Sequence, residues 1–227
     1  MNKQYSFSNS LSRDIESAAE SVIGNYANDI HSDEPAISSA FCQAVCSQID
    51  DRGDNIQIRA RTNRSAGVRN EEAISGADIL IRFEADFSDF SMKSGVFVQA
   101  KRIESSSYPN REKLSTQCHK MLRWTPASFV FIYSEENMTV IPAASIIGAN
   151  ELSENVRGKL YYKNIYRLHK EIFNGTIGDR RVAKLFESRL EAESVGITNY
   201  LEVIVGDDLG DRDYNPDEYL TEKTADY

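Results

Sequence analysis

Three polar residues stand in or beside apolar segments in the middle of the chain: Asp78, Gln99 and Lys101. Asp78 directly precedes the run 79–83, and the other two interrupt the otherwise apolar segment 95–101. Polar groups in such segments are costly unless something satisfies them. If the three converge, they offer two oxygen donors to a hard cation such as Mg²⁺ and an ammonium that can stabilise negative charge. A bound cation of this kind activates water for phosphodiester hydrolysis.

The geometry of β-strands decides whether these residues can meet. Successive side chains of a strand point to opposite faces of the sheet, so Gln99 and Lys101 share a face with Phe97. In the preceding segment Asp78 lies on the face opposite Ile79. We therefore expect the three polar side chains to lie together if the two segments are antiparallel neighbours.

The patterns on both sides of these segments predict the elements that hold them in place. Apolar residues at helical spacing predict a helix over 11–30, and Ser32 or Asp33 can cap a second helix that has Pro35 in its first turn. The remaining predicted elements are strands at 56–61, 77–83 and 95–101, a helix with Leu114, Cys118, Met121 and Leu122 on one face, and strands at 128–133 and 138–141. The segment 84–94 is expected to be a polar turn. The long connection between 101 and 128 predicts a right-handed crossover between parallel strands.

The remainder of the chain is expected to be a mostly helical extension that ends in a strand at 200–205. One apolar stripe contains Leu160, Tyr161, Ile165, Leu168 and Ile172, and another contains Val182, Leu185, Phe186 and Leu190. The predicted fold is α/β, a mixed central sheet flanked by helices, with one domain over 1–206. Its core spans about 10–142 and the helical extension spans 143–206. Residues 207–227 hold eight acids and two bases, which predicts a flexible acidic tail.

The motifs around the polar residues add a resemblance to a known family. Gly76-Ala77-Asp78, a strand connection and then Val98-Gln99-Ala100-Lys101-Arg102 resemble the restriction-endonuclease-like PD-(D/E)xK superfamily, and most of all its Mrr-like branch, in which glutamine replaces the third-strand acid. The resemblance extends over about residues 10–142 and includes the order helix–strand–strand–strand–helix–strand. It implies that Asp78 and Gln99 bind Mg²⁺ or Mn²⁺ and that Lys101 is the catalytic lysine. Because Gln99 is neutral, we expect a lower metal affinity than an Asp/Glu pair would give.

The superfamily often adds a glutamate from the first helix, and several residues compete for this role. Glu16 and Glu20 are the candidates on the first predicted helix. Glu72, beside Glu71 and just before the Gly76-Ala77-Asp78 turn, is their rival. The sequence leaves the choice open.

Bulk composition limits the setting in which this chemistry can occur. The net charge of -9 falls mostly on the acidic tail, while basic stretches at 59–69 and 101–123 can contact nucleic acid. The chain lacks an apolar run long enough to span a membrane and a signal-peptide pattern at its start. Three unframed cysteines, Cys42, Cys46 and Cys118, are expected to be buried reduced thiols rather than a zinc site. We therefore expect a cytoplasmic protein.

The sequence predicts a metal-dependent endonuclease that acts on DNA, as a homodimer or under a regulatory partner protein. By analogy with Mrr-like effectors, the setting is bacterial or phage defence. The alternative is a catalytically inactive module of the same fold that binds DNA or a protein. DNA is the expected substrate, and RNA is the alternative.

Overall fold

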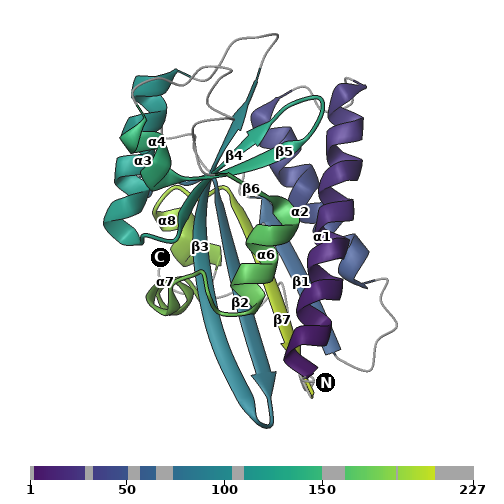
Figure 1. Ribbon diagram of the computed structural model, residues 1–227. Helices are drawn as coiled ribbons and strands as arrows, with labels where there is room; N and C mark the ends of the chain where they lie inside the picture. The colour runs from purple at the N-terminus through teal and green to yellow at the C-terminus, as the bar shows by residue number, and fades with distance from the viewer. Residues whose placement is uncertain are drawn as a thin grey trace, which may run out of the picture.

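The structure is a computed structural model that describes residues 3–28, 33–50, 57–64, 74–103, 110–149, 162–187 and 189–207. Within these ranges, seven strands form one mixed sheet (Figure 1). In spatial order the strands are β1 (Gln57–Arg64), β7 (Asn199–Gly206), β2 (Ile79–Phe87), β3 (Phe90–Arg102), β4 (Ser128–Tyr133), β5 (Met138–Pro142) and β6 (Lys163–Asn164). The predicted α/β class with a mixed central sheet is confirmed.

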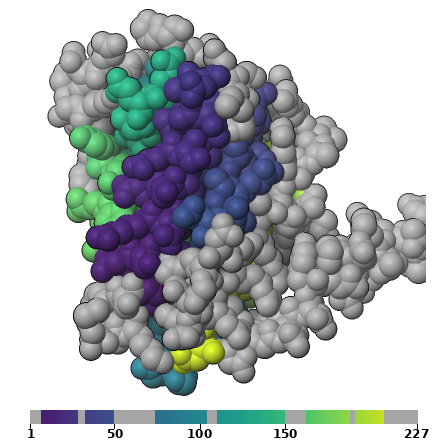
Figure 2. All heavy atoms as spheres, turned by 90° about the vertical axis from the view of Figure 1, so that its right-hand side faces the viewer, coloured from purple at the N-terminus to yellow at the C-terminus, as the bar shows by residue number. Residues whose placement is uncertain are grey.

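Helices cover both faces of the sheet, and each face has its own apolar core. The first face packs against α1 (Lys3–Ala27), α2 (Glu34–Asp50) and α6 (Ile165–Phe173). Figure 2 shows α1 and α2 side by side on this surface. The second face packs against α3 (Arg111–Trp124), α4 (Ala143–Gly148), α7 (Arg180–Leu185) and α8 (Arg189–Ser194). The polar residues of interest lie on the second face.

The N-terminal helices agree with the sequence pattern. Helix α1 starts earlier than predicted, at Lys3, and ends at Ala27. Helix α2 begins directly after Asp33, whose side chain accepts a hydrogen bond from the Ala36 N–H at 2.7 Å. That capping contact fixes the first turn of α2, which contains Glu34.

Strands β2 and β3 form a long antiparallel hairpin, and its turn lies well beyond the part of β3 that pairs with β4. The expectation of a polar turn over 84–94 is wrong, because only Ser88 and Asp89 form the turn. The polar residues of this segment are accommodated in the strands because the interior satisfies them. Glu84, for example, is buried and paired with Arg82 at 2.8 Å.

The β3–α3–β4 crossover has the predicted parallel geometry. Asn110 caps α3 by accepting a hydrogen bond from the Lys113 N–H at 3.0 Å, and the helix ends at Trp124, two residues before Pro126. Helix α3 buries Leu114, Cys118 and Met121 against the sheet face that carries Phe97. This crossover places α3 over the end of β3 that contains Gln99.

The C-terminal part of the chain completes the sheet rather than only adding helices to it. Strand β7 lies between β1 and β2, antiparallel to the first and parallel to the second. A final strand was predicted, but its central place was not, because strand order depends on contacts across the whole chain. Leu185, expected in a buried stripe, is 55% exposed at the end of the short helix α7. The tail from 208 onward and residues 160 and 161 lie outside the described residues.

His169 is buried in the first core without a full set of hydrogen bonds. Its Nδ1 lies 2.9 Å from the Ile165 carbonyl oxygen, and no described residue forms a hydrogen bond with its Nε2. The ring packs against Phe41 and Phe173. Burial disfavours the charged imidazolium and lowers the pKa of His169 to about 4, although the hydrogen bond to Ile165 opposes this shift.

This burial predicts an acid-sensitive contribution to stability. Below its ordinary pKa the imidazole binds a proton in the unfolded chain but not in the folded one, so stability falls as pH drops from about 6.5 to about 4. His169→Leu should remove this component. Between pH 7 and pH 5, urea unfolding should therefore lose roughly 2 kcal/mol less stability in the variant than in the unsubstituted protein. An identical pH dependence in the two proteins contradicts the prediction.

Candidate active site

Asp78 occupies a fixed position because hydrogen bonds hold its backbone on both sides. Its N–H donates to the Val98 carbonyl at 2.9 Å, and its own carbonyl accepts from the N–H groups of Thr198 and Asn199 at 3.2 and 2.9 Å. The segment that ends at Asp78 therefore lies between the start of β7 and the body of β3. The backbone is satisfied, and the carboxylate is turned toward β3.

Gln99 meets this carboxylate from the neighbouring strand. Its Nε2 donates to Asp78 Oδ2 and, at 3.0 Å, to the Ala100 carbonyl. The Ala100 N–H donates to the same Oδ2 at 2.9 Å. Gln99 is only 1% exposed, and its Oε1 has no hydrogen-bond partner among the described residues. The predicted meeting of Asp78 with Gln99 is thus present, and it leaves one buried amide oxygen without a donor.

Lys101 forms an ion pair that sequence reasoning did not anticipate. Its Nζ lies 2.8 Å from Glu34 Oε1, and Glu34 Oε2 accepts a hydrogen bond from the Arg102 N–H at 3.2 Å. Ser38 holds the same turn of α2, because its hydroxyl donates to the Glu34 carbonyl at 2.9 Å and lies 3.1 Å from the Tyr133 hydroxyl. Glu34 is thereby fixed beside the end of β3.

Glu34 is a further acid near Asp78 that the sequence interpretation did not name. Glu16, on α1, accepts a hydrogen bond from Asn164 at 3.2 Å, and Glu20 is exposed on the same helix. Neither is among the groups that most affect the charge of Asp78, whereas Glu34 is. Glu72 lies outside the described residues. The available signal for Glu34 was its position directly after a helix cap, where an acid is often explained by the helix dipole alone.

Burial makes the ionised form of Asp78 costly. Desolvation, strengthened by the nearby Glu34 carboxylate, raises the pKa of Asp78 to about 6. Lys101, the Ala100 N–H and Lys113 oppose this rise. One other carboxylate and two ammonium groups therefore act on the Asp78 carboxylate, so a small change in the local charge changes its ionisation.

Helix α3 closes over the segment that leads to Asp78. Gly76 has a φ of 71°, and a Cβ at this position would lie 2.5 Å from the Gln117 carbonyl oxygen and 2.9 Å from Lys120 Cβ. Glycine is required here both by the backbone conformation and by the close approach of the helix. Cys118, buried on the same helix, is near enough to Lys101 for that charge to affect it.

The donor set fits a hard cation better than a soft one. Among the described residues, no group of three or more histidine, cysteine, aspartate or glutamate side chains could hold a metal. Cys42, Cys46 and Cys118 form no disulfide. Cys118 belongs to the core on the second face of the sheet, and the other two belong to the core on the first face. The oxygen donors near Asp78 are its own carboxylate, that of Glu34 and the unpaired amide oxygen of Gln99. Mg²⁺ and Mn²⁺ accept such a small oxygen set because water and substrate phosphates complete their coordination.

Comparisons of the chain with protein-family models, curated proteins and solved structures found no match. None of the described helices combines the length and apolar character needed to cross a membrane.

The raised pKa of Asp78 predicts that this residue destabilises the metal-free protein at neutral pH. The unfolded chain loses the proton near pH 3.8, whereas the folded protein holds it up to about pH 6, so ionisation disfavours the folded state above that range. In EDTA at pH 7, Asp78→Asn should be more stable by up to roughly 3 kcal/mol, and the gain should shrink as pH falls toward 4.

The same variant provides a metal readout that does not depend on activity. Mg²⁺ or Mn²⁺ should raise the melting temperature of the unsubstituted protein and leave that of Asp78→Asn unchanged. A variant that is less stable at every pH, or that retains the metal-dependent shift, contradicts the assignment of Asp78.

Proposed function

We propose that this protein is a Mg²⁺- or Mn²⁺-dependent nuclease that hydrolyses phosphodiester bonds, with DNA as its expected substrate. The observation that carries the proposal is the meeting of Asp78, Gln99, Lys101 and Glu34 at one end of β3. Two of these residues are acids, and the other two are buried or half-buried polar residues in the otherwise apolar segment 95–101 of β3. Burying polar groups costs free energy, and a strand end with only a structural role does not need them.

The residues divide into cation ligands and a charge-stabilising group. Asp78 and Gln99 would hold the divalent cation, with Glu34 as the nearest further carboxylate. When bound, the cation lowers the pKa of a coordinated water and polarises the phosphoryl group. Lys101 presents its ammonium at the same strand end and stabilises the charge that develops on the phosphate oxygens. The ion pair with Glu34 orients the Lys101 side chain, which is only 14% exposed.

The order of elements also supports the proposal. If α1 and α2 are counted as one helical element, the order of elements is α1–β1–β2–β3–α3–β4, which is the order expected for the PD-(D/E)xK superfamily. Strand β7 is inserted between β1 and β2, which is an addition to that order. The restriction-endonuclease-like fold, a role in bacterial or phage defence and a homodimeric or partner-controlled state are parts of the same proposal and rest on the resemblance.

One observation favours a second candidate, an inactive nuclease-fold module that binds DNA or protein. Lys101 is paired with Glu34, and Asp78 is hydrogen-bonded by Gln99, so most of the polar set is satisfied without a cation. A site that had lost its activity while keeping its fold would retain such pairs. The unpaired Gln99 Oε1 and the destabilised Asp78 carboxylate favour the active form.

A nicking assay on supercoiled plasmid, run with Mg²⁺, Mn²⁺ or EDTA, tests the proposal. Cleavage should require the metal and fall by at least about 100-fold in Lys101→Met, because the variant lacks the group that stabilises developing negative charge. Glu34→Gln should also reduce the rate, since it removes the partner of Lys101. Lys184→Met is the matched control, because Lys184 is an exposed lysine on α7.

The variants should keep the melting temperature and circular dichroism of the parent protein. Metal-dependent cleavage that survives unchanged in Lys101→Met excludes the assigned site. If the unsubstituted protein cleaves neither duplex nor single-stranded DNA or RNA, and Mn²⁺ leaves its melting temperature unchanged, the inactive module is correct.

A further inference from the structure

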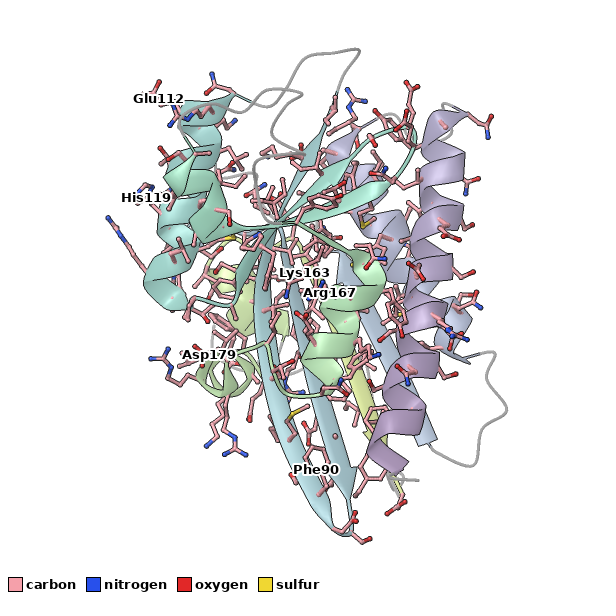
Figure 3. The ribbon with its side chains drawn as sticks, in the orientation of Figure 1. Phe90, Glu112, His119, Lys163, Arg167 and Asp179 are labelled. Atoms are coloured by element: carbon pink, nitrogen blue, oxygen red, sulfur yellow. The ribbon has the colours of Figure 1, made fainter. Side chains whose placement is uncertain are left out.

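Helix α3 presents one side to the segment that contains Asp78, and that side has no assigned role. Lys113, Gln117 and Lys120 lie at helical spacing along a single stripe next to the buried one. The close approach of Gly76 to Gln117 and Lys120 places this stripe directly against residues 76–78. Figure 3 shows Glu112 and His119 on the outer side of the same helix, away from the sheet.

Lys113 is the exposed cation of this stripe. Its side chain is exposed, and its positive charge acts to lower the pKa of Asp78. Within the part of the chain that the structure describes, no acid forms an ion pair with it. Lys101 differs, because its ammonium is already paired with Glu34. Of the two ammonium groups around Asp78, Lys113 is therefore the one available to an incoming anion.

Gln117 provides an independent observation on the same stripe. Its Oε1 is buried and has no hydrogen-bond partner among the described residues. Such an atom costs roughly 1–3 kcal/mol and is tolerated where a ligand supplies the missing donor. Helix side chains lean toward the helix N-terminus, so the amide of Gln117 extends from the level of Gly76 toward Lys113.

We propose that the Lys113–Gln117 side of α3 is the wall on which the sugar–phosphate backbone of a nucleic acid lies when it enters the site. Lys113 binds a phosphate adjacent to the one that is cleaved, and Gln117 Oε1 accepts a hydrogen bond from a water held at that phosphate. This assignment rests on the proposed nuclease function. It adds a binding surface on α3, opposite the strands that carry Asp78 and Gln99.

Binding measurements in Ca²⁺ test the wall separately from catalysis. A fluorescein-labelled DNA duplex, and an RNA of the same sequence, are titrated with protein between about 50 and 200 mM salt. Lys113→Gln should weaken binding by about 3- to 10-fold at the lowest salt and reduce the slope of log affinity against log salt by about 0.9 for duplex DNA. Lys184→Gln is the matched control, because α7 packs at Gly95, about 13 Å along β3 from Gln99 by strand geometry.

Two further readouts separate a binding role from a structural one. Lys113→Gln should raise Mn²⁺ affinity, measured by calorimetry, because it removes a cation near Asp78 while weakening nucleic-acid binding. Gln117→Met should stabilise the free protein, because it removes an unpaired buried acceptor, yet weaken nucleic-acid binding. A residue that only supports the fold would change stability and binding in the same direction.

The outcomes distinguish this inference from the proposed function. Equal losses of affinity in Lys113→Gln and Lys184→Gln, or no loss in either, overturn the α3 wall even if the protein cleaves DNA. A specific loss in Lys113→Gln supports the wall even if no cleavage is found, in which case the proposed catalytic function fails alone. Absence of binding to both polymers at the lowest salt overturns the wall.

Discussion

The arrangement of the site depends on the hydrogen bonds that hold the backbone of Asp78. Its N–H donates to β3 and its carbonyl accepts from residues 198 and 199 at the start of β7, so two chain segments hold this one residue. Both backbone groups of Asp78 are hydrogen-bonded, so its carboxylate is left to accept hydrogen bonds from the Gln99 amide and the Ala100 N–H. Gly76, two residues earlier, lets α3 approach this segment closely and complete the enclosure.

Two clusters of polar side chains on the second face of the sheet differ in how completely their hydrogen bonds and charges are paired. Arg82 lies between Glu84 and Glu202, donates to the Ala183 carbonyl, and is almost fully buried. This network pairs its charges internally, as a structural buried network must. Around Asp78, by contrast, a carboxylate is destabilised and the amide oxygens of Gln99 and Gln117 lack donors. Among the described residues, the end of the sheet at Asp78 is therefore less completely satisfied than the Arg82 network.

Stability and the proposed chemistry oppose each other at this point. Burial raises the pKa of Asp78, so its ionised form is less favourable in the fold than in water, and the proposed cation would compensate for the lost hydration. The neutral Gln99 would contribute an oxygen to that cation without adding a further negative charge beside Glu34. In the proposed site this limits the repulsion between carboxylates at the expense of metal affinity. Lys101 and Lys113 balance the remaining charge from two directions, the strand and the helix.

The sequence by itself determined the local elements and the faces of the strands. Apolar periodicity identified α1, α2, α3 and β4, and two-residue alternation placed Asp78, Gln99 and Lys101 on one face, because side-chain direction along a strand is a local property. The sequence did not determine the partner of Lys101, the length of the β2–β3 hairpin or the central place of β7. Glu34 is 67 residues from Lys101 in the chain. Strands β2 and β7 are likewise distant in the sequence and pair only in the folded sheet. These contacts therefore depend on tertiary packing. The polar residues of the segment 84–94 gave a turn-like pattern because some of their partners, such as the Ile177 carbonyl for the Ser94 hydroxyl, are distant in the chain.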